Sequence, residues 1–380
     1  GPFDVVIMNP PYVGEKGNKA LFDEVRGLGA PWSSRCAARM DYLYFFLHLG
    51  LDVLEPDGAF AALTTAYWPA ATSAAGLRAD LLARGHVERF VRFTGKGLFG
   101  TAPGQHNLAV AVRRQDGGGP GWSWCDARWT GTVLENGPVE RLEATLPDGS
   151  WQPFLRAEDA AWLAALDWDT TLGQVAVDRQ GVVSGCDRMH DGPLFVLDAA
   201  EAQARGWLGA WFLEPLLRGS EIRPLLEAGQ GAQHVPSAYV LYLDGTRTPP
   251  FDVLSHLSRA RARLEDRRET KLGKRPWWAL HWPRDRELMR RPKLVTARRA
   301  PAPAFYLDRE GLVVNSDCTW IVPERVSAEV LQAALHHADV ARLLALTGKW
   351  KGALCEFYSE PLRSLRLPLG AGVNAIRERR

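Results

Sequence analysis

The stretch FDVVIMNPPYVG, residues 3–14, decides the fold that we expect for the first part of the chain. Five of the six residues at 3–8 are apolar, and a Pro-rich turn follows at once. A short apolar run closed by such a turn predicts a buried β-strand. Ligands of open α/β sheets bind beyond the carboxyl ends of the strands, and Asn9-Pro10-Pro11-Tyr12 stands at such an end. The tetrad is therefore a candidate active site.

Working outward from this stretch, strand and helix patterns alternate as far as residue 114. Helices are indicated by apolar residues at helical spacing behind a polar cap, and strands by short apolar runs between turns. Alternation of this kind predicts an α/β sheet. The predicted elements are a mobile loop over 14–40, a helix over 41–54 capped by Asp41, a turn at 55–58, a strand over 59–65, a helix over 73–85, and strands over 87–93 and 107–114.

The pattern changes in the second part of the chain. Residues 122–170 are Trp-rich, and we interpret them as sheet edge plus linker. Beyond them, short strands and Gly turns surround one basic helix over 251–272 and a final helix near 327–346. A chain of 380 residues, 46% of them hydrophobic, is long enough for two domains. We expect domains at 1–150 and 171–369, followed by a basic tail at 370–380.

The composition excludes several classes of site. The five cysteines form no Cys-x-x-Cys pair, which argues for reduced thiols and against a zinc site. His336-His337 has no Cys or carboxylate at ligand spacing, so a place in the core or on a helix surface is the better interpretation. No apolar run approaches the ~20 residues of a membrane span, and no signal peptide is recognisable. We therefore expect a cytoplasmic protein without a metal or a membrane partner.

The tetrad combines residue types that suit chemistry on an amino group. Pro10 and Pro11 lack an N–H and have a fixed φ, so their stiff turn leaves carbonyl groups free to accept hydrogen bonds. The Asn9 side-chain oxygen and the Pro10 carbonyl can accept from one –NH2 group, which localises the nitrogen lone pair for attack on an activated methyl group. Tyr12 offers a flat face for the ring that carries this group. The alternative is an ordinary Pro-rich turn with Tyr12 in the core.

The tetrad and later segments resemble γ-type DNA adenine-N6 methyltransferases with a TaqI-like specificity domain, as in the methylase half of type IIG restriction–modification enzymes. The resemblance rests on NPPY at 9–12, DYLYFFLHLGLDVLEPDGAFAALTT at 41–65, GKGLFGTAPGQHNLAVAVRR at 95–114, and a looser ordered series of segments after residue 171. It implies Tyr12 and Phe99 as two walls of a target-base pocket. It also implies S-adenosylmethionine as the cofactor, held here by Asn9, Pro11, Asp41 and Phe46.

The resemblance implies a fold class and a reaction. The fold would be the C-terminal part of a Rossmann-like, S-adenosylmethionine-dependent methyltransferase sheet, followed by a mixed α+β target-recognition domain. The reaction would be site-specific methylation of adenine N6 in duplex DNA by base flipping, within a restriction–modification or phage-defence system. Most of the family's cofactor site precedes the tetrad, and only eight residues precede it here. We expect a portion of a longer enzyme that is inactive alone, with the missing N-terminal part as a partner where it is a separate chain.

Positive charge is concentrated in one segment. Residues 259–299 hold 15 Lys and Arg against 5 Asp and Glu, whereas residues 1–150 hold 14 against 16. Cations interleaved with aromatic residues suit contact with double-stranded DNA, and a polar turn at 184–188 suits contact with base edges. The predicted DNA-binding residues are Asp187, Arg188, Lys271, Lys274, Arg275, Arg290, Arg291, Lys293, Arg298 and Arg299.

Plainer interpretations of the same segments stay open. They are a solvated helix face over 259–268, core packing of Trp277, Trp278 and Trp282, and an ordinary hairpin turn at 184–188.

Two other functions also stay open. Protein-glutamine and ribosomal RNA methyltransferases use the same tetrad on planar –NH2 groups, but they usually end soon after it, whereas this chain continues for 368 residues. Alternatively, the chain alone is a DNA-binding specificity module without activity, which would bind DNA but not the cofactor. No PD…ExK nuclease pattern is recognisable, so no cleavage is assigned to the chain.

Overall fold

The computed structural model of the chain describes residues 2–95, 98–99, 106–117, 121–142, 151–186, 194–229, 234–351 and 354–370. The chain forms two compact units, Gly1–Leu166 and Asp167–Arg380. In the described part, none of the helices combines the length and the apolar character that crossing a membrane requires. All five cysteines are free thiols.

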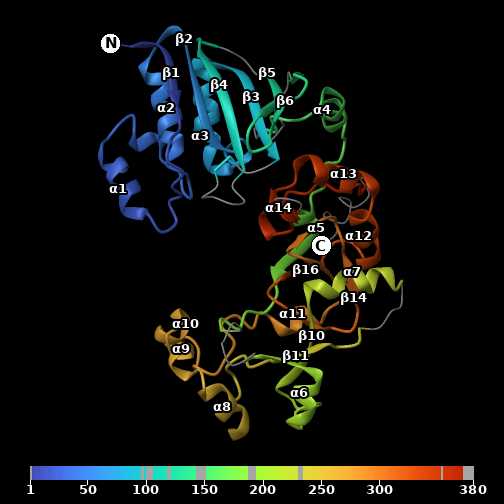
Figure 1. The fold of residues 1–380 in the computed structure, drawn as a ribbon. Coiled ribbons are helices and arrows are strands. Elements are labelled where there is room, and N and C mark those ends of the chain that lie inside the picture. Colours follow the sequence, from blue (N-terminus) through green and yellow to red (C-terminus); the bar gives the residue numbers. More distant parts are fainter. Residues whose placement is uncertain are drawn as a thin grey trace. The chain divides into compact units, whose positions relative to one another are not determined.

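The first unit is built on a seven-stranded mixed sheet (Figure 1). The strand order is β1-β2-β4-β3-β5-β6, and β7 also pairs with β5. β1 runs parallel to β2, β4 is antiparallel to both of its neighbours, and β3 runs parallel to β5. The strands are β1 (Phe3–Met8), β2 (Leu54–Thr65), β3 (Gly85–Gly95), β4 (Asn107–Arg114), β5 (Trp122–Trp129), β6 (Leu134–Asn136) and β7 (Glu140–Leu142).

Two helices pack against this sheet, α2 (Leu43–Val53) and α3 (Ala75–Arg84) (Figure 1). Gly50 lets α2 approach closely, because a Cβ at this position would lie 2.7 Å from Met8 Cε and 3.0 Å from the Phe60 ring. The close approach fixes the later part of α2 beside Met8 at the end of β1. A β-bridge between Gly14 and Asp41 joins the chain after the tetrad to the residues just before α2. The other helical segments are α1 (Lys19–Gly27), η1 (Ser33–Arg35), η2 (Trp68–Ala70), η3 (Thr72–Ala74) and α4 (Ala157–Ala164).

The structure corrects several predictions for the first unit. The strand over 3–8, which we expected to be buried, is largely exposed along β1. The expected mobile loop over 14–40 contains α1 and η1. The N-cap of α2 is Tyr42, one residue after the predicted Asp41, although the Asp41 carboxylate still accepts a hydrogen bond from the Leu43 N–H at 3.1 Å. The predicted turn at 55–58 is an irregularity inside β2, where Asp57 has a φ of 65°.

The Trp-rich segment supplies an edge of the sheet through β6 and β7, as predicted, but its tryptophans belong to the core and not to a linker. β5 lies between β3 and β6 in the sheet. Trp122 and Trp151 are buried with their ring centroids 5.2 Å apart, and Phe90 lies 5.4 Å from Trp122. The Trp151 N–H also donates to the carbonyl of Pro69 at 3.0 Å. Residues from Trp151 onward therefore extend the first unit beyond the predicted limit at 150.

The second unit is a mixed α/β structure with short strands, and most of its buried apolar side chains form one cluster. Its sheets have the orders β15-β10-β11-β9, β14-β12-β16-β8 and β13-β18-β17. The strands are β8 (Ala176–Gln180), β9 (Val196–Asp198), β10 (Leu213–Leu217), β11 (Ala238–Leu241), β12 (Lys293–Ala297), β13 (Arg299–Ala300), β14 (Tyr306–Asp308), β15 (Val313–Val314), β16 (Cys318–Pro323), β17 (Trp350–Lys351) and β18 (Leu354–Glu356). Five of its helices are α5 (Leu172–Val175), α6 (Ala199–Ala204), α7 (Gly219–Glu227), α11 (Arg286–Arg290) and α14 (Ser359–Arg363).

Both long helices predicted for this unit are divided. The basic helix expected over 251–272 is α8 (Phe251–Ser258), α9 (Arg261–Glu265) and α10 (Arg268–Lys271), and the final helix is α12 (Ala328–Leu335) and α13 (Ala338–Thr347). Arg267 has an extended backbone between α9 and α10, and its guanidinium donates to the carbonyls of Ser184, Trp277 and Ala279. Between α12 and α13, His336 Nε2 accepts from the Phe305 N–H at 3.1 Å, and His337 caps α13.

Candidate functional site

The tetrad directly follows β1, at the carboxyl ends of the parallel strands β1 and β2. Asn9 is exposed, Pro10 is buried and Tyr12 is half-buried. The Tyr12 hydroxyl lies 3.0 Å from Asn9 Oδ1 and 2.9 Å from the carbonyl oxygen of Leu63 on β2. A phenol has one proton, so Tyr12 donates to only one of these acceptors at a time. When it donates to Leu63, the exposed Asn9 oxygen is free to accept from a ligand.

Asp41 ties the residues after the tetrad to the beginning of α2. Its Oδ1 accepts from the N–H of Val13 at 3.2 Å and of Leu43 at 3.1 Å, and the Tyr42 N–H donates to the Val13 carbonyl at 2.8 Å. Burial raises the pKa of the Asp41 carboxyl, and the backbone N–H groups oppose this shift. Burial likewise raises the pKa of Tyr12, and the charge of nearby Asp41 adds to it. Asn9, Tyr12 and Asp41 are thus brought together.

Asn107 belongs to the same place, although the sequence did not single it out. It is the first residue of β4 and pairs with Thr65 at the end of β2. Its side chain is 3% exposed, and its Nδ2 has no hydrogen-bond partner of normal geometry among the described residues. It nevertheless lies close enough to Tyr12 to lower the pKa of that hydroxyl, against the larger effect of burial. The only sequence signal is a polar residue at the start of an apolar strand, which is too common to indicate a site.

The aromatic residues expected around the site are less well defined. Phe46 is half-buried on α2, with its ring centroid 5.9 Å from that of Tyr42. Phe99 is also half-buried, but residues 96–97 and 100–105 on either side lie outside the described part of the chain. The second wall of the pocket therefore stays a prediction.

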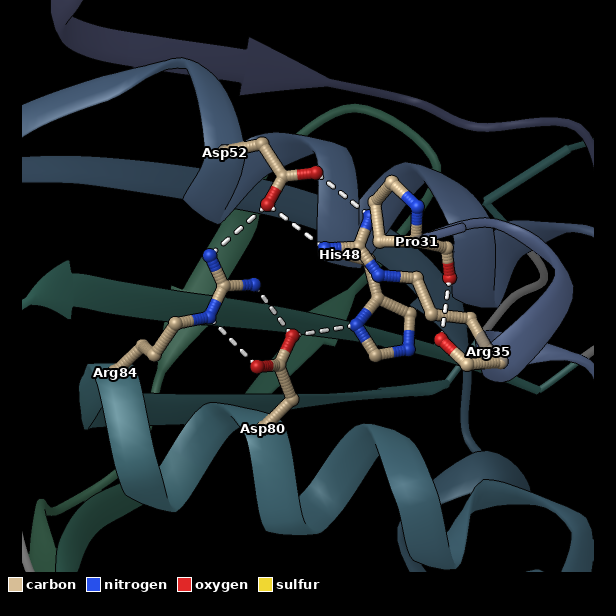
Figure 2. Close-up of polar contacts among 7 residues, drawn as sticks. Pro31, Arg35, His48, Asp52, Asp80 and Arg84 are labelled. Atoms are coloured by element: carbon tan, nitrogen blue, oxygen red, sulfur yellow. Dashed lines mark hydrogen bonds and ion pairs between the residues drawn. The ribbon is translucent and has the colours of Figure 1, made fainter. Parts of the chain in front are cut away.

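A network of charged side chains holds α2, which carries Phe46 and begins just after Asp41 (Figure 2). Asp80 on α3 accepts from His48 on α2 at 2.6 Å and forms two hydrogen bonds with Arg84. The Asp52 carboxylate forms ion pairs with Arg84 at 2.9 Å and with Arg35 of η1 at 2.6 Å. Burial alone would raise the pKa of Asp80, but Arg84 and His48 outweigh it and hold this pKa well below its usual value. The network therefore joins η1, α2 and α3.

Most of the predicted DNA-binding cations of the second unit already interact with other parts of the protein. Lys293 is wholly buried, forms an ion pair with Asp308 and donates to the Met289 carbonyl at 2.6 Å, so its assignment to DNA is wrong. The other contacts are Lys271 with Asp266, Lys274 with Glu269, Arg290 with Glu214 and Glu287, Arg299 with Glu356, Arg275 with the Asp244 carbonyl, and Arg291 with the Pro323 carbonyl.

The remaining sequence candidates for DNA contact are the turn residues Asp187 and Arg188, the tryptophans of the basic segment, and Arg298. Asp187 and Arg188 lie outside the described residues. Trp277 and Trp278 are partly buried against the core of the second unit, whereas Trp282 is 38% exposed. The guanidinium of Arg298 stacks on the Tyr358 ring at 4.1 Å. Within the described part of the chain, no group of three or more His, Cys, Asp or Glu side chains is arranged to hold a metal ion.

Comparison with known proteins gives matches for each part of the chain. The Type II methyltransferase M.BanIII of Aneurinibacillus aneurinilyticus is 30% identical over 71 residues, which are 19% of this chain and 12% of M.BanIII. Among solved structures, the Type IIL restriction-modification enzyme MmeI in complex with DNA has a TM-score of 0.61 at 14% identity, over 95% of this chain. The chain spans 46% of that MmeI chain, and the likeness is one of fold.

A second structural match and a family match complete the comparison. The DrdV–DNA complex matches with a TM-score of 0.43 at 12% identity, over 97% of this chain and 43% of that one. The model of the Eco57I restriction-modification methylase family matches residues 1–99, which contain the tetrad, α2 and the strands β1, β2 and β3. Residues 1–99 are thus similar to the Eco57I restriction-modification methylase family.

Proposed function

We propose that this chain supplies the catalytic turn and the target-recognition domain of a restriction–modification enzyme that methylates adenine N6 in duplex DNA. The observation that carries the proposal is the exposed Asn9 side chain at the carboxyl end of β1, beside the half-buried Tyr12 ring. The match of residues 1–99 to a restriction–modification methylase family supports it. The likeness to MmeI supports the fold of the chain that carries this turn.

The chain's own residues hold the target amino group and the base. The Asn9 side-chain oxygen and the Pro10 carbonyl each accept a hydrogen bond from one N–H of this amino group, which favours a pyramidal nitrogen with a localised lone pair. Tyr12 donates to the Leu63 carbonyl, so that Asn9 Oδ1 is free for this role. The Tyr12 ring stacks on the extrahelical base, and Phe99 is its proposed second wall. Catalysis then rests on position and polarisation, without a covalent bond to the protein.

The described residues fit one side of an S-adenosylmethionine site. Phe46 offers a half-buried aromatic surface on α2, and Asn9 and Pro11 are exposed at the turn after β1. Asp41 Oδ1 is already occupied by two backbone N–H groups, so Asp41 orders the turn at least as much as it contacts a ligand. When bound, S-adenosylmethionine supplies a methyl group activated by a positively charged sulfur.

The edge of the sheet supports a contribution from further strands. β1 is the edge strand, and its Phe3, Val5 and Ile7 side chains are 56%, 66% and 84% exposed. An edge strand with exposed apolar side chains is a surface on which another strand can pair. The rest of the cofactor site is proposed to lie on strands that continue the sheet beyond β1, in the same polypeptide or in a partner chain.

Transfer of a tritiated methyl group tests the proposed substrate class. The enzyme would be the full-length product of the gene that encodes this chain, and the substrates would be duplex DNA, ribosomal RNA and total protein. We expect label in duplex DNA alone. Label in RNA or protein would favour the other methyltransferase classes that use this tetrad. Binding of duplex DNA by this chain without any labelling would favour a specificity module.

A further inference from the structure

Three arginines converge at one end of the sheet β14-β12-β16-β8. Arg179 lies on β8, and Arg298 follows directly after β12. Arg284 precedes α11, and its Nε and Nη2 lie 3.2 Å from the Gly181 carbonyl and 3.3 Å from Gln180 Oε1, at the end of β8. The ladders place Gln180 opposite Thr319 and Thr319 opposite Thr296, so the strand ends that carry these arginines are neighbours across β16.

Arg284 is close enough to Arg298 and Arg179 for their positive charges to act on it. The pKa of Arg284 is lowered first by burial, and then by the charges of Arg298 and Arg179. Nearby Asp178 is engaged by Arg363 at 2.6 Å. Among the described residues, none of the three arginines forms an ion pair with a carboxylate, in contrast to Lys271, Arg290 and Arg299. A cluster of like charges without a counter-charge favours binding of an anion.

Contacts with aromatic rings and carbonyl groups hold this cluster in place. The Arg298 guanidinium stacks on Tyr358 at 4.1 Å, and its Nε is buried without a hydrogen-bond partner in the described structure. Arg284 has a φ of 68°, which is unusual for a residue with a side chain, and lies 5.9 Å from the exposed Trp282 ring. Guanidinium groups that are ordered by the fold lose less freedom when they bind a phosphate oxygen.

We propose that Arg179, Arg284 and Arg298 form a phosphodiester-binding site for the backbone of duplex DNA. Guanidinium groups match the geometry of phosphate oxygens, and contacts to phosphates fix how a protein lies on the duplex without reading its sequence. Val183 forms a β-bridge with Trp282, so the chain that leads to Asp187 and Arg188 leaves from beside this site. The inference rests on the proposed action on duplex DNA, and it names the part of the chain that holds the backbone.

Salt dependence of binding tests the site. The full chain would be titrated with a fluorescein-labelled duplex of mixed sequence at a series of NaCl concentrations, followed by anisotropy. Each phosphate contact contributes about 0.9 to the slope of log K against log salt concentration, so Arg179→Gln is expected to lower the slope by about one and the triple Gln variant by up to about three. The matched control is Arg309→Gln, because Arg309 is an exposed arginine of the same unit already paired with Glu329 at 2.9 Å. The control should keep the parental slope.

The outcomes separate the site from the proposed function. If the parental chain binds the duplex and the Arg179→Gln chain keeps its slope, the phosphate site is wrong while action on DNA stands. If the parental chain does not bind duplex DNA at any salt concentration, both fail. Arg179 is exposed, so its variant should fold even if the triple variant does not. Arg298→Lys keeps the charge, and it should keep the slope but weaken binding, because the stacked planar group is lost.

Discussion

At the scale of single residues, the Tyr12 hydroxyl has one proton and two acceptors, Asn9 Oδ1 and the Leu63 carbonyl. The half-buried hydroxyl has a raised pKa, chiefly through burial, so it stays protonated and able to donate. Donation to Leu63 fixes the ring at the end of β2, and donation to Asn9 occupies the oxygen proposed for the target amino group. The tetrad therefore combines an aromatic face with an acceptor that is free whenever Tyr12 donates to Leu63.

Two variants of Tyr12 separate these roles. Tyr12→Phe keeps the aromatic face and removes the hydroxyl, so stacking should persist while stability falls by about 1 kcal/mol for the lost hydrogen bond. Tyr12→Ala should also lose the stacking on the base, worth ~1–3 kcal/mol. Steady-state methyl transfer, with kcat and KM determined for both variants, measures the difference. Equal loss in the two variants would contradict a stacking role for the ring.

Lys293 shows how a residue with the right charge can have a structural role. It stands directly opposite Asp308 in the β12–β14 ladder, and both side chains are fully buried. Lys293→Met should destabilise the second unit by about 3–5 kcal/mol, because Asp308 is left as a buried charge without its partner. Urea unfolding measures this change. The salt dependence of DNA binding should remain that of the parental chain at a temperature where the variant is folded, and a reduced slope would restore Lys293 as a DNA contact.

At the scale of elements, Asp80 joins α3 to α2 through His48 and to its own helix through Arg84 (Figure 2). Asp80→Asn should lower the free energy of unfolding by about 1–3 kcal/mol at neutral pH, since the pair is only partly buried and solvent screens part of the interaction. Asp23→Asn is the matched control, because Asp23 pairs with Arg26 at 2.7 Å on an exposed helix face. The control should change stability by less than about 0.5 kcal/mol.

The same network gives a direction to the pH dependence. The folded-state pKa of Asp80 lies below its unfolded value of 3.8, so its contribution is fully present above that value and is lost as the pH falls toward the folded-state pKa. The stability difference between the parental chain and Asp80→Asn should therefore shrink as the pH is lowered below 3.8. Denaturant unfolding at a series of acidic pH values measures it. A difference that grows on acidification would contradict the lowered pKa.

Comparison of the observed and predicted elements shows which features local sequence patterns can predict. β1, α2, β3 and β4 lie close to their predicted ranges, because apolar runs and helical spacing are properties of neighbouring residues. The division of the helix expected over 251–272 depends on Arg267, whose guanidinium binds carbonyls that are distant in the chain. The turn at 9–12 was predictable, because its two prolines end the apolar run of β1. Asn107 was not, because only strand pairing brings it to the end of β2.

At the scale of the whole molecule, the distribution of charge differs from what a residue count indicates. Residues 259–299 are strongly basic, yet most of their predicted DNA contacts are paired with carboxylates or carbonyls. Arg284 instead lies near Arg179 and Arg298, three arginines without an ion pair among the described residues, and Arg179 comes from outside the basic segment 259–299. Pairing therefore decides which cations are available to a polyanion.

The open edge of the first sheet gives a prediction for the whole chain. Val5 and Ile7 are exposed on β1, so replacing both with Lys should leave the chain folded and reduce its self-association. In the assembled enzyme the same change should reduce methyl transfer, because strands proposed to continue the sheet could no longer pack there. Sedimentation velocity of the chain alone and methyl transfer by the assembled enzyme are the two measurements. Full activity in the variant would contradict continuation of the sheet at this edge.

The central claim is that Asn9 holds the amino group of adenine for methylation. The most direct test expresses the full-length gene that encodes this chain in a bacterial host without adenine methylation and measures modified nucleosides in hydrolysed genomic DNA by mass spectrometry. We expect N6-methyladenine with the parental protein and none with Asn9→Ala, while binding of the purified variant to duplex DNA is unchanged. N6-methyladenine at the parental level with Asn9→Ala, or N4-methylcytosine as the product of the parental protein, would contradict the account.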